Sequence, residues 1–201
     1  MITWNTIVEA VGLKKKFSGL PAGAQSALMG AMTTIGQGLE RHVKVNKLGG
    51  QALKVRTGNL RRAVFHRVGV TNIAGATDVY VVVGVDLRRA PYGRIHELGG
   101  TITPKKSKYL TIPLKAARTA NGVARFTARD LIANPGSFGY TGTFFRNAVL
   151  FGKKGKSITP LFALKTSVKI KAVGYLKGTV AEKRPWAVSV VQQAVQNWVQ
   201  K

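Results

Sequence analysis

The sequence predicts an α+β fold in which an antiparallel sheet packs against a long N-terminal helix and a C-terminal helix. Three patterns predict it: a helical period over residues 20–45, alternating apolar residues in the middle of the chain, and an amphipathic stripe over Pro185–Val199. Residues 1–100 and 161–201 are expected to form a single α+β core domain. Residues 101–160, rich in Gly, Pro, Asn and Lys, are expected to form an inserted arm, either an extended β-hairpin or a loop.

The longest helix is expected over residues 20–45, with Pro21 in its first turn and Gly49-Gly50 after its end. Apolar residues recur there at three- and four-residue steps, at Leu28, Ala31, Ile35, Leu39 and Val43. Each glycine inside this segment lowers helix stability by up to about 1 kcal/mol relative to Ala; they are Gly23, Gly30, Gly36 and Gly38. Packing must therefore stabilise the helix, and the small residues allow a neighbour to approach closely.

A hairpin is expected to follow. Thr57 is suited to cap a short helical turn over Thr57–Val64. Strands are then expected at Val64–Thr71 and Val79–Val85, the second apolar on nearly both faces as in a central strand. Pro91–Leu98 predicts a short helix that ends at Gly99-Gly100.

Two more strands and the last helix complete the prediction. Tyr109–Leu114 alternates, with Pro113 indicating a sheet edge. Leu164–Lys171 has a strict period of two, which predicts one strand carrying Lys165, Lys169 and Lys171 on the same side. The apolar stripe of the terminal helix, Val188, Val191, Val195 and Trp198, fits an intramolecular core helix or a subunit interface. Thr179 and Glu182 have the spacing of a capping box before that helix.

The charge is strongly unbalanced, with 32 Lys and Arg against 7 Asp and Glu. Between Leu98 and Ala181 there are 15 basic residues and one acid, Asp130. Such a surface either repels itself in water or faces an anion. The residues predicted to face DNA or another anionic partner are Lys105, Lys106, Lys153, Lys154, Lys156, Lys165, Lys169 and Lys171. The alternative is that the strand lysines only protect a sheet edge from aggregation.

Catalytic patterns fail on inspection, so an enzyme, a cofactor site and a metal site are not expected. The chain has no Cys, and its three His are scattered. Gly155-Lys-Ser157 lacks the earlier glycine of a phosphate-binding loop, because that position is Leu150. After Gly36-Gln-Gly38, the third glycine of a dinucleotide fingerprint is replaced by Arg41. The seven carboxylates have no paired spacing.

Nucleic-acid recognition motifs are also missing from the sequence. Aromatic residues make up 8% of the chain, and Phe138, Tyr140, Phe144 and Phe145 cluster where few basic residues lie. Any nucleic-acid contact is therefore expected to involve the backbone rather than the bases. No apolar run approaches the roughly 20 residues of a membrane-spanning helix, and residues 1–9 do not resemble a secretory signal. A protein made in the cytoplasm, with no membrane partner, is expected.

Five segments together resemble a known family: Val55–Arg62, Pro91–Gly100, Lys108–Leu114, Thr159–Lys171 and Tyr175-Leu176. Their order and spacing are similar to those of the minor tail, neck and tail-completion proteins of tailed bacteriophages, the family of the lambda tail-completion protein Z. The motif positions are Thr57, Gly58, Leu60, Arg61, Tyr92, Glu97, Gly99 and Gly100. The chain departs from the family at Val173–Gly178, where many relatives read Arg-Pro-Phe-Leu-Arg-Pro.

The resemblance implies a structural virion protein that forms a ring, most simply a hexamer, between the head connector and the tail tube. Its partners would be copies of itself, the connector or adaptor, the tail-terminator or tail-tube proteins, and double-stranded DNA passing through the channel. The motif residues would be structural. Independently of the resemblance, Glu97 lies on a short helix that ends at Gly99-Gly100, amid a large excess of Arg and Lys, so it is expected to pair with a cation. The alternative is a stand-alone nucleic-acid-binding protein without sequence specificity.

Overall fold

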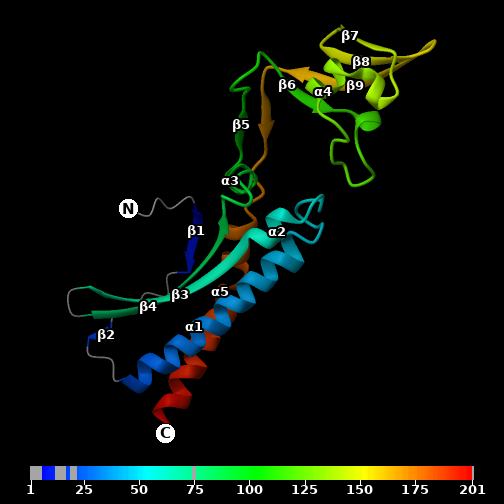
Figure 1. Cartoon of the computed structure of the whole chain (residues 1–201). Helices are drawn as coiled ribbons and strands as arrows, with labels where there is room; N and C mark the ends of the chain where they lie inside the picture. The colour runs from blue at the N-terminus through cyan, green and yellow to red at the C-terminus, as the bar shows by residue number, and fades with distance from the viewer. Residues whose placement is uncertain (1–5, 12–16, 19–21, 74–75, 201) are drawn as a thin grey trace. The chain divides into compact units, whose positions relative to one another are not determined.

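The computed structural model describes residues 6–11, 17–18, 22–73 and 76–200; the N-terminus and Pro21, on which two expectations rest, lie outside these residues. It confirms the α+β class, with a long N-terminal helix, a C-terminal helix and antiparallel sheets (Figure 1). The chain divides into two compact units, residues 1–98 with 172–201, and residues 99–171. The second unit is an insertion into the first.

The first unit is built on one antiparallel sheet. Its central strand pairs with one neighbour along one edge and with two short strands along the other. The strands are β1 (Thr6–Val11), β2 (Phe17–Ser18), β3 (Val64–Ile73) and the central β4 (Ala76–Asp86). The expected hairpin is therefore present, but both strands run closer to the turn than the sequence predicts. The sequence analysis missed β1 and β2.

Two long helices run side by side in this unit (Figure 1), and α1 also packs on β3 and β4. The helical elements are α1 (Ala22–His42), the π-helical turn η1 (Val43–Lys47), α2 (Asn59–Ala63), α3 (Gly93–Leu98) and α5 (Tyr175–Val199). Ile35 and Leu39 of α1 meet alternate valines of β4 in one buried core. Close approach is confirmed at Gly38, where an added Cβ would overlap the Trp186 ring of α5, but not at Gly30, whose Cβ would have no atom within 4 Å.

The last helix differs from its prediction. It begins ten residues earlier than expected, at Tyr175, and Pro185 lies inside it. The capping box is wrong, because Thr179 is already helical and its hydroxyl donates to the Tyr175 carbonyl. Thr57 is likewise not the cap of α2; Gly58 takes that position with φ 72°, a left-handed conformation that glycine adopts without strain.

The second unit has a core of its own, so it is a small folded body rather than an arm. Buried Leu150, Leu161 and Phe162 pack with Ala117, Ala128 and Leu131. The strands are β5 (Gly100–Ile102), β6 (Leu110–Pro113), β7 (Gly142–Arg146), β8 (Val149–Lys154), β9 (Ser157–Lys165) and β10 (Val168–Ile170). Between them lie η2 (Lys115–Ala117), α4 (Ala128–Ala133) and η3 (Pro135–Phe138). Residues 161–171 belong here and not to the first unit, because β9 pairs with β6 and β8.

Candidate functional site

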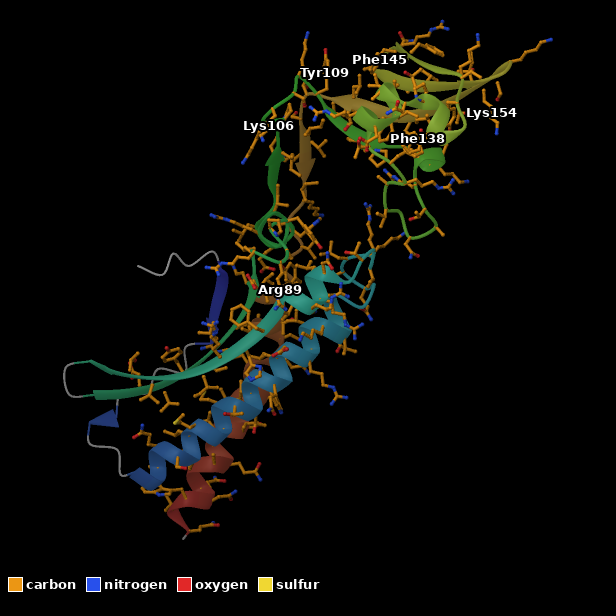
Figure 2. All side chains as sticks on the ribbon, in the orientation of Figure 1. Arg89, Lys106, Tyr109, Phe138, Phe145 and Lys154 are labelled. Carbon is orange, nitrogen blue, oxygen red and sulfur yellow. The ribbon has the colours of Figure 1, made fainter. Side chains whose placement is uncertain are left out.

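The eight lysines predicted to face an anionic partner are all exposed and all lie in the second unit. Lys105 and Lys106 lie in the connection from β5 to β6, and Lys153, Lys154 and Lys156 surround the turn of the β8–β9 hairpin, where Lys154 projects from the ribbon (Figure 2). The remaining three are Lys165, Lys169 and Lys171.

The expectation that these last three share one strand is wrong. Lys165 ends β9 and lies opposite Leu110, whereas Lys169 belongs to β10 and lies opposite Thr101. Lys171 follows β10. The period of two continues through exposed Thr166 and Ser167, where the chain leaves one sheet and joins another, so the pattern did not reveal the break.

Positive charge is concentrated in the second unit. It holds 14 of the 32 basic side chains but only one of the seven carboxylates, Asp130. Few of its cations can therefore be neutralised within the unit, and a field of one sign attracts anionic partners over distances near the Debye length. The second unit is the part of the chain best suited to meet an anion.

One face of the sheet in this unit carries aromatic and basic side chains together, which the sequence analysis did not anticipate. The strand order is β6-β9-β8-β7, and α4 with the core covers one face. Phe144 and Phe151 lie opposite each other in β7 and β8. Their rings stack, with centroids 5.3 Å apart and an angle of 11° between the ring planes. One sequence signal could have pointed to this hairpin, the short Asn147-Ala148 connection between two segments that contain Phe.

The family-like segments meet at a second place, here called the clasp, formed by residues 93–98 and 173–177 of the first unit. Two backbone bonds join them, from Val173 N to the His96 carbonyl at 2.8 Å and from Gly174 N to the Glu97 carbonyl at 3.1 Å. The Tyr175 hydroxyl donates to the Gly93 carbonyl at 3.1 Å. These bonds attach the start of α5 to α3.

Glu97 is at the centre of the clasp and is 3% exposed. Its two carboxylate oxygens accept hydrogen bonds from Leu176 N and Lys177 N, each at 2.9 Å. These amides belong to the first turn of α5, where backbone N–H groups lack helical partners and the helix dipole favours a negative charge. Glu97 therefore caps α5. The predicted structural role agrees with this geometry, but among the described residues the partners of Glu97 are backbone amides and not the predicted cation.

Two ionisable side chains beside Glu97 have shifted pKa values. Burial, and then the Glu97 carboxylate, raise the pKa of Tyr175 well above its usual value, so its phenol stays protonated. Burial and the positive charge of Arg56 lower the pKa of His96. What the clasp shows is hydrogen bonding and packing between α3 and the start of α5.

The other motif positions serve the backbone or the surface. Leu60 is buried beside the clasp, where a Cβ at Gly93 would lie 3.1 Å from its Cδ1 atom. Gly99 and Gly100 have positive φ angles of 73° and 146°, which explains the paired glycines. Arg61 is exposed, and Tyr92, also exposed, meets the His96 ring edge to face.

Two carboxylates next to η1 bind the remaining histidines. Glu40 accepts a hydrogen bond from Lys44, and its carboxylate lies 2.5 Å from His66 Nδ1. Burial alone would raise the pKa of Glu40, but these hydrogen bonds outweigh burial and hold the pKa below its usual value. Glu182 on α5 accepts from Lys47 at 2.8 Å, and chiefly this bond lowers the pKa of Glu182. His42 lies 3.3 Å from the same carboxylate. The pairs link α1, β3 and α5.

Within residues 6–11, 17–18, 22–73 and 76–200, no three or more His, Asp or Glu side chains gather as a metal site would require. The helices in this part of the chain are too short or too polar to cross a membrane. Comparison with protein-family models, with curated proteins and with solved structures finds no match.

Proposed function

We propose that this chain is a structural protein of a tailed-phage virion, a ring-forming neck or tail-completion component between the head connector and the tail tube. The observation that carries the proposal is the spatial grouping of the segments that resemble this family. Val55–Arg62, Pro91–Gly100 and Tyr175-Leu176 meet at the clasp through Leu60, Gly93 and Tyr175. The other two, Lys108–Leu114 and Thr159–Lys171, pair as β6 and β9.

Segments that match a family by chance have no reason to become neighbours in the fold, so the grouping supports the resemblance. The residues at the clasp make packing contacts and backbone hydrogen bonds, which suits a protein that works by assembling rather than by catalysis. The proposed partners are further copies of the chain, the connector or adaptor, the tail terminator or tube, and the DNA in the channel. The protein would be assembled in the host cytoplasm and remain in the virion neck.

The second candidate function is a stand-alone nucleic-acid-binding protein without sequence specificity. The charge of residues 99–171 favours it, because most non-specific affinity comes from lysines and arginines at phosphates. The same charge suits a neck protein that lines a DNA channel or docks on an acidic ring, so oligomeric state has to separate the two functions.

Size-exclusion chromatography with light scattering, followed by negative-stain microscopy, makes this separation. A neck protein should give closed rings of about six copies of the 21.6 kDa chain, alone or after addition of purified connector. A small species that never closes into rings, yet shifts DNA at low salt, would replace the neck proposal with the second candidate.

The basic surface of the second unit should matter for head–tail joining. A triple Lys→Glu variant at Lys165, Lys169 and Lys171 should fold but join heads to tails poorly or lose DNA, because these exposed positions would then repel an anionic neighbour. The matched control reverses the same charge in the first unit, at exposed Lys54, Arg88 and Arg184. Normal infectious particles from the first variant would show that those lysines are only solvated.

A further inference from the structure

The sheet of the second unit has one face that its own core does not cover. Register assigns residues to this face, because directly opposite residues of antiparallel strands point the same way and successive residues along a strand point to opposite faces. The register shift between Leu150 and Phe151 lets Pro160 and Phe162, two residues apart in β9, point to different faces. Phe151 lies opposite Phe144 and Pro160, and Lys153 lies opposite Ile158. Leu150 and Phe162, opposite each other, point to the buried core instead. We call the first set the open face.

Large apolar groups lie in the middle of the open face. Phe144 is 36% exposed and Ile158 is 56% exposed, and Pro160 is exposed beside them. Phe144 packs against Phe151 with nearly parallel rings, so one aromatic ring supports the other. A ring held flat by a neighbour, with more than a third of its area in contact with water, is a ready platform for a second planar group.

Basic side chains surround this apolar centre. By the same register, Arg146, Lys153 and Lys165 point to the open face, and all three are exposed. They come from the ends of β7, β8 and β9. The fold therefore brings together aromatics and cations that the sequence keeps apart, which removes the reason for expecting no base stacking.

We propose that the open face binds single-stranded nucleic acid, with a base stacked on Phe144 and phosphates near Arg146, Lys153 and Lys165. Single-strand binding sites combine a positively charged track with exposed aromatic platforms, and this face has both. Duplex DNA fits less well, because its bases are stacked on one another and it offers only phosphates to an apolar centre. The open face of a second copy is disfavoured as the occupant, because Arg146, Lys153 and Lys165 would then face the same basic side chains.

The inference is independent of the neck function, because it concerns the purified chain and an oligonucleotide alone. Fluorescence anisotropy with labelled oligo(dT) of about 20 nucleotides measures the affinity, and a duplex of equal length is the first comparison. Oligo(dT) should bind at least about tenfold more tightly than the duplex at moderate salt. Oligo(rU) in a parallel titration tells whether DNA or RNA is preferred.

Phe144→Ala should weaken oligo(dT) binding about tenfold, the usual effect of removing one stacking ring. Phe145→Ala is the matched control. Phe145 is the adjacent residue, is 57% exposed, and points to the other side of β7 by alternation, so its loss should leave affinity unchanged. Phe144→Trp should restore binding, which separates stacking from any loss of folding. Lys153→Ala should weaken binding and reduce the dependence of log K on log salt by about 0.7.

Three results would each overturn the proposal: equal affinity for the duplex and the single strand, equal effects of Phe144→Ala and Phe145→Ala, or poly-glutamate binding as tightly as oligo(dT) with the same dependence on Phe144. The last would identify the open face as a site for an acidic protein. Circular dichroism of every variant establishes that the sheet is intact before affinities are compared.

Discussion

Replacing Glu97 by Gln tests whether the clasp holds α5. Gln keeps the shape of the side chain, but its amide NH₂ would face one of the two N–H donors that the carboxylate now accepts. The variant loses one hydrogen bond to a charged acceptor, about 1.5–3 kcal/mol, and a charge–dipole interaction of about 0.3–1 kcal/mol. Relief from burying a charge offsets part of this, so the free energy of unfolding should fall by about 2 kcal/mol.

The assay is urea unfolding followed by tryptophan fluorescence. Trp186 and Trp198 belong to the first unit and residues 99–171 contain no tryptophan, so the signal does not come from the second unit. A loss of about 2 kcal/mol lowers the midpoint by about 1 M for a slope of about 2 kcal/mol per M.

Glu182→Gln is the control for Glu97→Gln. It removes a carboxylate from the same helix, but one whose side chain is half exposed, so its effect should be much smaller. A Glu97→Gln midpoint equal to that of the wild type would show that α5 does not depend on this cap. A specific hydrolytic activity that disappears in the same variant would instead make Glu97 a catalytic residue.

Three further predictions concern packing, strain and pH. Gly38→Ala should lower the free energy of unfolding by about 1–2 kcal/mol, because the new Cβ would overlap the Trp186 ring. Gly30→Ala should raise it by up to about 1 kcal/mol, because no atom lies within 4 Å of the new Cβ. Denaturation midpoints report both changes. Ala148→Gly should raise the thermal midpoint slightly, because Ala148 has φ 58° in its turn. The pKa of Glu40 is lowered in the folded protein, so the Glu40 carboxylate stabilises the fold above the unfolded pKa near 4.5 and loses this effect as pH falls through the folded pKa. The difference in unfolding free energy between wild type and Glu40→Gln should therefore shrink between about pH 6 and pH 3.

The helices and the main hairpin could be predicted because their signals are local. Leu28, Ile35 and Leu39 recur with the helical period, and all are buried on one side of α1. The start of α5 could not, because it depends on Glu97, almost eighty residues away in sequence. Proline suits the first turn of a helix, so the sequence predicts a helix start at Pro185. In the structure the helix begins at Tyr175 and continues through Pro185.

In the candidate sites, too, local features could be predicted from the sequence and contacts between distant residues could not. Glu97 was predicted to be structural from its short helix and the excess of cations, but its partners are backbone amides that no side-chain pattern reveals. The exposed lysines were visible from composition. Their arrangement on separate sheets was not, because Lys165 and Lys169 fit one alternation across a change of strand partner. Phe144 and Arg146 became one surface only through cross-strand pairing.

The clasp also explains how the first unit accommodates a large insertion. The chain leaves the first unit after Leu98 and returns at Ala172, and the backbone bonds from Val173 and Gly174 to His96 and Glu97 fix the two ends beside each other. Inside the insertion, Gly100 pairs with Ile170, so the ribbon β5–β10 continues this closure. Closing a loop costs entropy that grows only slowly with its length, and here both ends are already held by hydrogen bonds. The first unit therefore needs the residues of the clasp and not the content of the insertion, which leaves the second unit free to carry its excess of basic side chains and its exposed aromatic residues.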